Sequence, residues 1–372
     1  MLSNNQEAFL ALVRAGLWEK EVRLTQYEPI NYKEVYRLAQ EHAVVGLVAA
    51  GLEHVVDIKV STEDVLVLVG EALQLEQRNT AMNSFIAVLI EKMRNAEIYT
   101  LLIKGQGIAQ CYERPLWRAS GDVDLLLSDS NYELAKSFLM PLSVNKSLEL
   151  KGEKHFKLTI ETWSVELHGN LPTTVSSKID RVINTIVQDT FYGGNVRSWI
   201  NNDVYIFLPE ENNDVILVFT HILKHLFYGG IGLRQFCDLC RLLWYYKESL
   251  DKTLLENRIK QMGVLSEWKS FAAFAVHTLG MPESVLPCYS DEPKWDKKAN
   301  RLGSIILEYG NFGHSKECYS YRSRPFVIRK ALSFCRNTRE SMRLFRVFPY
   351  DTTRTWFRMV WFGTIAAFKK KR

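Results

Sequence analysis

The chain has 372 residues, 47% of them hydrophobic and 24% charged, which is enough apolar material for two or three folded domains. No Gly/Ser, Pro or Gln tract and no internal repeat interrupts it, so collagen-like, low-complexity and disordered classes are excluded. The formal charge is +5, but residues 321–372 contain 14 Lys and Arg against only Glu340 and Asp351, which leaves a net −7 on the rest. An acidic body with a basic tail argues against a nucleic-acid partner.

The sequence also indicates the cellular compartment in which the protein is expected. Its six cysteines are dispersed, and the first residues lack the basic-then-apolar layout of a signal peptide. The longest apolar stretch, residues 356–368, is interrupted by Arg358 and is shorter than the ~20 residues needed to cross a bilayer. We therefore expect a cytoplasmic protein without a transmembrane segment.

Residues 1–98 show apolar side chains at helical spacing, which predicts an N-terminal helical region. Ser61 and the acidic residues after it form an expected N-cap and first turn of a long helix that ends near Asn95. The pattern changes at Tyr99. Residues 99–208 then form a separate region of mixed secondary structure.

Within residues 99–208, short apolar runs at 100–105 and 122–127 predict strands, and residues 154–169 predict a hairpin turning near Thr162-Trp163. Helical patterns follow at 105–113, 130–139 and 176–188. The order strand, helix, strand, helix, hairpin indicates the α+β fold class, with a compact core embedded between helical regions.

Residues 209–320 return to the helical period and predict a C-terminal helical bundle. Residues 321–372 form a basic, aromatic tail divided at Phe348-Pro349. One interpretation is an interfacial helix that contacts anionic lipid at the inner face of a membrane. The other, which we favour, is a terminal helix that packs its aromatic face on the body.

Three carboxylates are the first candidate site. Asp122 and Asp124 flank one residue at a strand start, so both project from the same face. Glu166 lies on the polar face of the second hairpin strand, together with His168. Three carboxylates on neighbouring strands can hold two metal ions for in-line nucleotidyl transfer, with Mg²⁺ or Mn²⁺ as the expected ion. The alternative is that they are solvated surface residues.

Lys104, Gly105 and Gln106 stand where a strand passes into a helix, a position that favours phosphate. The Walker A spacing is absent, and an ordinary strand-to-helix turn is the alternative. Arg118 precedes Asp122 by four residues, close enough to bind a triphosphate or to orient the aspartates through a salt bridge. His155 and His168 line the same cleft in one interpretation and are structural in the other.

Residues 101–127, LLIKGQGIAQCYERPLWRASGDVDLLL, resemble the signature of the uncharacterised nucleotidyltransferase family, within the DNA-polymerase-β-like superfamily. The segments VELHG and FTHILKHLFYGGIGLRQFCDL are similar to the family's acidic strand and to a later helical segment. The matching positions are Lys104, Gly105, Arg118, Asp122, Asp124, Glu166, His168, His221, His225, Arg234 and Asp238.

The resemblance implies a small mixed sheet, Mg²⁺, and a nucleoside triphosphate donor such as ATP, whose nucleoside monophosphate passes to an unknown acceptor hydroxyl with release of pyrophosphate. The implied catalytic metal ligands are Asp122, Asp124 and Glu166, and the implied nucleotide-binding residues are Lys104, Gly105, Gln106, Arg118, His225 and Arg234. Gln106 departs from the superfamily, which usually has Ser or Gly there. A catalytically inactive nucleotide-binding or membrane-surface scaffold is therefore the alternative.

The later helical segment has two further interpretations. His221, His225, Cys237 and Cys240 have a spacing compatible with zinc, although cysteines in such an apolar run more often pack in a core. The resemblance instead implies that His221, His225, Arg234 and Asp238 form a polar network over the nucleotide cleft. A purely structural network is the remaining alternative.

Overall fold

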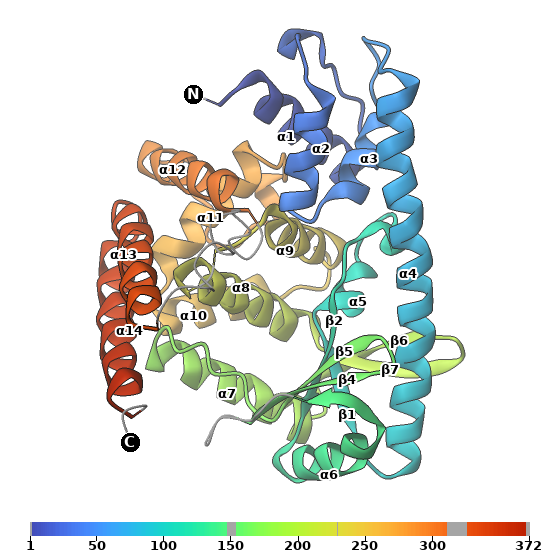
Figure 1. Cartoon of the computed structure of the whole chain (residues 1–372), viewed down its shortest axis with the longest axis vertical. Helices are drawn as coiled ribbons and strands as arrows, with labels where there is room; N and C mark the ends of the chain where they lie inside the picture. Colours follow the sequence, from blue (N-terminus) through green and yellow to red (C-terminus); the bar gives the residue numbers. More distant parts are fainter. Residues whose placement is uncertain (1, 147–153, 229, 311–325, 370–372) are drawn as a thin grey trace.

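The structure is a computed structural model that describes residues 2–146, 154–228, 230–310 and 326–369 (Figure 1). Its helices are α1 (Asn4–Trp18), α2 (Tyr32–Glu41), α3 (Val45–Leu52), α4 (Thr62–Asn95), α5 (Gly105–Ala109), α6 (Asp129–Leu139), α7 (Ser177–Tyr192), α8 (Glu211–Tyr228), α9 (Leu233–Tyr245), α10 (Lys252–Met262), α11 (Leu265–His277), α12 (Pro293–Tyr309), α13 (Phe326–Phe345) and α14 (Pro349–Lys369). Short 3₁₀ turns are η1 (Thr25–Tyr27), η2 (Pro115–Trp117), η3 (Met140–Leu142) and η4 (Glu283–Val285).

The strands form one five-stranded sheet and a separate hairpin. They are β1 (Thr100–Ile103), β2 (Asp122–Leu127), β3 (Ser143–Lys146), β4 (His155–Ile160), β5 (Trp163–His168), β6 (Val196–Asn201) and β7 (Val204–Pro209). The sheet order is β1-β2-β5-β4-β3, and β6 pairs with β7. Only the β2–β5 pairing in the larger sheet is parallel. The sheet is therefore mixed, and the expected α+β fold class is confirmed.

The two faces of this sheet differ in chemistry because side chains alternate along each strand. One face is apolar and packs on α6 and on the second half of α4; its buried residues include Leu125, Val165 and Leu158. The other face carries the acidic residues of β2 and β5. At its β1 end, α7 covers it with Val187 and Phe191. Toward β5, this face opens to the side chains of α8 and α9.

Helix α4 joins the N-terminal helices to the sheet. Its N-cap forms as expected, because the Ser61 hydroxyl accepts a hydrogen bond from the Asp64 backbone at 3.1 Å. Acidic residues in its first turn and basic residues in its last complement the helix dipole. In Figure 1 it runs past both α3 and the sheet. The predicted helix that ends near Asn95 is confirmed.

The N-terminal and C-terminal helices share one hydrophobic core. Phe9 of α1 lies in the same buried cluster as Phe219 of α8 and Trp268 of α11. The rings of Phe219 and Trp268 meet edge to face, with centroids 4.8 Å apart. Phe348, at the expected division of the tail, also belongs to this cluster. No helix in the described part of the chain has the length and apolar character that crossing a membrane requires.

One local prediction needs correction, and two features of the fold were not predicted. The helix expected over 105–113 ends at Ala109, and turns lead from there to η2. Strand β3 and the β6–β7 hairpin were not predicted. The hairpin turns at Asn202 and Asp203, both with positive φ, but its outward face exposes Ile200 and Tyr205, which obscures the alternation of polar and apolar residues.

Candidate nucleotide site

The strand register brings the three carboxylates together. Asp124 of β2 lies beside Glu166 of β5, and Asp122 lies beside Ser164 in the same parallel ladder. Residues two apart on a strand share a face, so Asp122, Asp124 and Glu166 all point to the polar side of the sheet. Asp124 is only 5% exposed. The predicted cluster therefore forms from two neighbouring strands.

Asp124 has two basic side chains as partners. The Lys104 ammonium donates to its Oδ1 at 3.3 Å, and Nε2 of His168 lies 2.7 Å from the same oxygen. Burial alone would raise the pKa of the Asp124 carboxyl, but Lys104 and His168 outweigh burial and hold this pKa well below its usual range. Asp124 is therefore a buried, ionised carboxylate.

Asp122 has a different environment. Burial, followed by the charges of Asp124 and Glu166, raises the pKa of its carboxyl, against the opposing charges of Lys104 and Arg234. Negative charge is thus in excess at the open end of the cluster, where a cation would be stabilised.

Glu166 is held by the neighbouring strand β4. Nζ of Lys157 donates to its Oε1 at 2.6 Å, and Nε2 of His155 lies 3.1 Å from Oε2. Burial raises the pKa of Glu166, but these partners overcome it and lower the pKa to about 2. The carboxylates of Asp124 and Glu166 are therefore both ionised, and the side chains around them fix their orientation.

Lys104 reaches the cluster from an unusual backbone conformation. Its φ is 58° and its ψ is −147°, and Gly105 follows with φ 45°. A non-glycine residue in such a region costs roughly 1–3 kcal/mol, which is typical of residues held in place at functional sites. The conformation ends β1 abruptly and directs the ammonium group toward Asp124.

A cavity of about 360 Å³ lies above the carboxylates. Its opposite wall comes from α8 and α9, with His221, His225 and Arg234 among the lining residues. Burial, then Lys104, lowers the pKa of His225 to about 4, so its imidazole is neutral near pH 7. Arg234 donates to the Ala119 carbonyl at 2.9 Å, while its buried Nε has no hydrogen-bond partner among the described residues.

Arg118 lines this cavity but does not pair with the aspartates of β2. Its guanidinium binds Asp238 of α9 through two hydrogen bonds of 2.7 Å, and the Tyr112 hydroxyl donates to the same carboxylate at 2.8 Å. The salt bridge considered between Arg118 and Asp122 or Asp124 is thus replaced by one to Asp238. Together with Arg234, this pair makes the polar network between the cavity and the helical core.

The prediction that the side chain of Gln106 binds the nucleotide needs correction. Its side chain is 1% exposed and points at α4, where its amide donates to Asn79 Oδ1 at 2.7 Å. Asn79 in turn donates to the carbonyls of Leu116 and Arg118 at 2.7 and 2.8 Å. The side chain of Gln106 is therefore not available to phosphate, because it supports the loop that carries Arg118.

Ser120 is a candidate that the sequence did not single out. Its hydroxyl is buried, lines the cavity and has no hydrogen-bond partner in the described chain. A Cβ placed on Gly105 would lie 3.4 Å from this oxygen, so the hydroxyl faces the end of β1. In the sequence, the position of Ser120 between Arg118 and Asp122 was the feature that could have identified it as a candidate.

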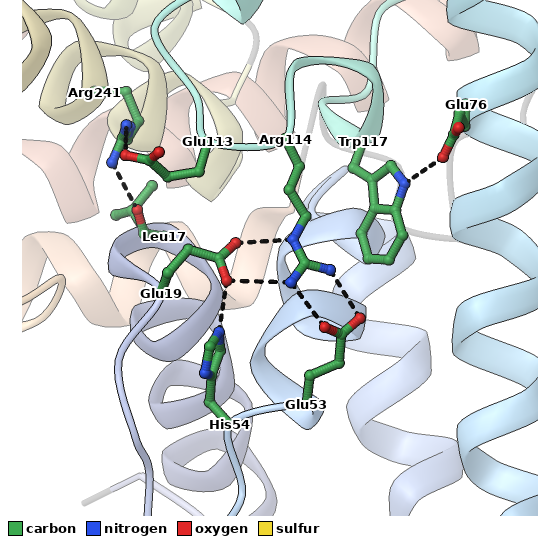
Figure 2. Close-up of polar contacts among 9 residues, drawn as sticks. All are labelled: Leu17, Glu19, Glu53, His54, Glu76, Glu113, Arg114, Trp117 and Arg241. Atoms are coloured by element: carbon green, nitrogen blue, oxygen red, sulfur yellow. Dashed lines mark hydrogen bonds and ion pairs between the residues drawn. The ribbon is translucent and has the colours of Figure 1, made fainter.

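The loop that carries Arg118 and Ser120, residues 110–121, is fastened to the N-terminal helices (Figure 2). Arg114 binds Glu19 at 2.9 Å and Glu53 at 2.7 Å. His54 binds Glu19 at 2.6 Å, and the Trp117 indole donates to Glu76 of α4 at 2.7 Å. Arg241 of α9 bridges the loop and α1, because it binds Glu113 at 2.8 Å and donates to the Leu17 carbonyl at 3.0 Å. The N-terminal helices thus position one wall of the site.

The zinc alternative has no support in the geometry. Cys237 and Cys240 are buried in the helical core, and burial raises the pKa of both thiols. Within the described ranges, the group with metal-ligand geometry consists of His155, Glu166 and His168. The two cysteines are core residues, as the favoured interpretation had it.

Comparisons with known proteins identify the family of the chain. Residues 28–280 match the family described as uncharacterised nucleotidyltransferase. The chain belongs to this family. No curated protein matches the sequence. A solved antigenic nucleotidyltransferase-like protein from Paracoccidioides brasiliensis is similar at 14% identity, with a TM-score of 0.30, over 50% of this chain and 90% of that one. Family membership supports a general nucleotidyltransferase role, with a nucleotide as donor.

Proposed function

We propose that the protein is a metal-dependent nucleotidyltransferase that transfers a nucleoside monophosphate from a triphosphate to an acceptor hydroxyl and releases pyrophosphate. One observation carries the proposal: the carboxylates of β2 and β5 share a sheet face and open into a cavity that Arg234 of α9 lines from the opposite wall and Arg118 lines from the loop before β2. Anionic and cationic groups facing each other across a cavity suit a ligand that combines divalent metal with phosphate.

The side chains fit a Mg²⁺ or Mn²⁺ ion, because Asp122, Asp124 and Glu166 supply only oxygen ligands, which these hard cations prefer. Such an ion would neutralise the charge that develops on the phosphate oxygens and activate the attacking hydroxyl. The carboxylate of Asp122 is half-buried and faces an excess of negative charge. It would therefore hold the ion nearest the cavity opening.

The other residues bind and position the donor. The Nε of Arg234 and the hydroxyl of Ser120, neither of which has a hydrogen-bond partner among the described residues, supply donors to phosphate oxygens. Lys104 shares its charge between Asp124 and the cavity. His225, neutral in this environment, lines the cavity beside them. This division of labour is mostly charge stabilisation and orientation, as phosphoryl-transfer chemistry requires.

The first test is binding, because the acceptor is unknown. ATP, GTP, CTP and UTP are titrated separately by calorimetry, with Mg²⁺ and with EDTA. We expect Mg²⁺-dependent binding of at least one triphosphate. Changing Asp122→Asn together with Asp124→Asn should weaken it at least ~100-fold, because several kcal/mol of charge stabilisation is lost.

The single variant Asp122→Asn separates binding from folding, since it leaves the ion pairs of Asp124 intact. Asp203→Asn, at a positive-φ turn outside the cavity lining, is the matched control. A folded wild-type protein that binds none of the four triphosphates would contradict the proposal, and so would a double variant with unchanged affinity.

A second function is favoured by one surface. Tyr350, Phe357 and Trp361 are 75%, 62% and 66% exposed and recur at i, i+7 and i+11, so they form one stripe along α14. Arg358 flanks the stripe, and residues 321–372 carry a net charge of +12. We infer that this face of α14 contacts an anionic lipid surface, inserting aromatic rings beneath the headgroups while cations bind phosphate.

Deleting the whole tail would be a poor test, because Leu344, Val347 and Phe348 belong to the hydrophobic core. The better variant changes Tyr350, Phe357 and Trp361 to Ser together. Wild type should cosediment with phosphatidylglycerol vesicles, less so as salt rises, and the triple variant should not.

The control for that variant is a triple change to Ser at Tyr99, Tyr192 and Tyr205, exposed aromatics on other elements. It should bind vesicles like the wild type. Equal vesicle binding by the α14 variant and the wild type would refute the lipid contact.

A further inference from the structure

Two histidines stand beside the carboxylate cluster in an arrangement that the proposed transfer reaction does not need. His155 begins β4 and is the register partner of His168 on β5, so both rings project from the polar face of the sheet. The rings stack with centroids 4.8 Å apart. Glu166, two residues before His168, lies on the same face. Three potential ligands thus come from adjacent strands of a rigid sheet.

The ligand atoms have a spacing close to that of a coordination sphere. One ring nitrogen of each histidine and one oxygen of Glu166 lie within 4.8 Å of one another. Oε2 of Glu166 is 3.1 Å from Nε2 of His155 and 3.9 Å from Nε2 of His168. Metal–ligand bonds of about 2.0–2.2 Å place neighbouring ligand atoms roughly 3–4 Å apart. Small side-chain rotations would therefore suffice to enclose an ion.

The surrounding contacts orient these atoms. Lys157 binds the other oxygen of Glu166, Oε1, at 2.6 Å, which leaves Oε2 facing the two imidazoles. Nε2 of His168 also lies 2.7 Å from Oδ1 of Asp124. Asp124 is thus within reach as a fourth ligand, and it connects this group to Asp122 on the same strand.

The two imidazole nitrogens distinguish this group from the all-oxygen site, with which it shares Glu166. Imidazole nitrogen suits Zn²⁺, Mn²⁺ and other transition metals, whereas Mg²⁺ binds oxygen. We propose that His155, Glu166 and His168 bind a divalent transition-metal ion, with Zn²⁺ or Mn²⁺ as the fitting ions, beside Asp124 and at the end of the cluster away from Asp122. This goes beyond the proposed function, because such an ion is bound whether or not a nucleotide is present.

The test uses metal alone, without nucleotide. Wild-type protein freed of metal is titrated with Co²⁺, followed by its visible ligand-field absorption, and the bound Co²⁺ is then displaced by Zn²⁺. We expect stoichiometric binding to the wild type. His155→Ala and His168→Ala should each lower the affinity at least ~10-fold, since loss of even an outer contact of a metal ligand costs that much. Unchanged thermal unfolding of the variants in the absence of metal shows that they fold.

His277→Gln is the matched control, because this histidine pairs with Asp296 at 2.9 Å and lies outside both the cavity lining and the three-residue group. It should bind Co²⁺ like the wild type. Wild type without bound Co²⁺, or folded His155→Ala and His168→Ala variants with wild-type affinity, would overturn the site.

Failure of the two proposals can be told apart. Histidine-dependent Co²⁺ binding in a protein that binds no triphosphate supports the metal site and contradicts the transferase. Mg²⁺-dependent triphosphate binding in a protein that ignores Co²⁺ does the reverse.

Discussion

Ser120 carries a sharp prediction at the scale of the single residue. Its buried hydroxyl has no partner in the described chain, so Ser120→Ala removes no hydrogen bond from the folded protein. A hydrogen bond to a charged group is worth about 1.5–3 kcal/mol, so the variant should bind the triphosphate roughly 10- to 100-fold more weakly with unchanged unfolding. Calorimetry and thermal unfolding measure the two effects.

Ser164 is the control, since its hydroxyl is likewise buried without a partner in the described ranges but does not line the cavity. Ser164→Ala should bind the triphosphate normally. If both Ser variants lost affinity equally, the effect would come from the sheet and not from a phosphate contact.

At the scale of the element, local patterns predicted most of what positions the site. The strand starts of β2 and β5 and the helix cap at Ser61 follow from alternation and capping, which depend on neighbours in sequence. The parallel β2–β5 register, which places Asp124 beside Glu166, depends on residues 42 positions apart. Strand alternation already predicted that these carboxylates could meet, and the family resemblance supported this grouping, while their ion pairs required the structure.

The missed hairpin and the unexpected partners of Gln106 and Arg118 have different causes. The β6–β7 hairpin exposes apolar residues on its outer face, so the alternation of polar and apolar side chains was masked. The side chains of Gln106 and Arg118 were assigned to phosphate from their position beside the motif. Their partners, Asn79 and Asp238, lie 27 and 120 positions away, so sequence spacing could not predict the pairings.

At the scale of the whole molecule, a buried carboxyl pair joins the tail to the body. Glu267 of α11 and Asp351 of α14 are 4% and 7% exposed. Burial, then the charge of Asp351 and a hydrogen bond to it, raises the pKa of Glu267 from 4.5 to about 8, while Lys298 opposes the shift. Neutral Glu267 therefore donates to the Asp351 carboxylate, which also pairs with Arg354 at 2.7 Å.

The pair makes the docking of α14 sensitive to pH. Between pH 4.5 and about 8, folded Glu267 retains a proton that the unfolded chain loses, so its contribution to stability falls as pH rises through this interval. The limiting slope for one group is about 1.4 kcal/mol per pH unit. Glu267→Gln keeps the donor and removes the titration. Its stability relative to the wild type should therefore increase with pH, as measured by denaturant unfolding at both ends of the interval.

Glu133→Gln, at an exposed position of α6, controls for loss of one negative charge and should show a constant difference from the wild type at every pH. A Glu267→Gln difference that is equally constant would mean that Glu267 is ionised in the folded protein. Because α14 bears the exposed aromatic stripe, a pH-dependent difference would also place the helix proposed to contact lipid under the control of a buried proton. Its vesicle binding should then be compared at the same two pH values.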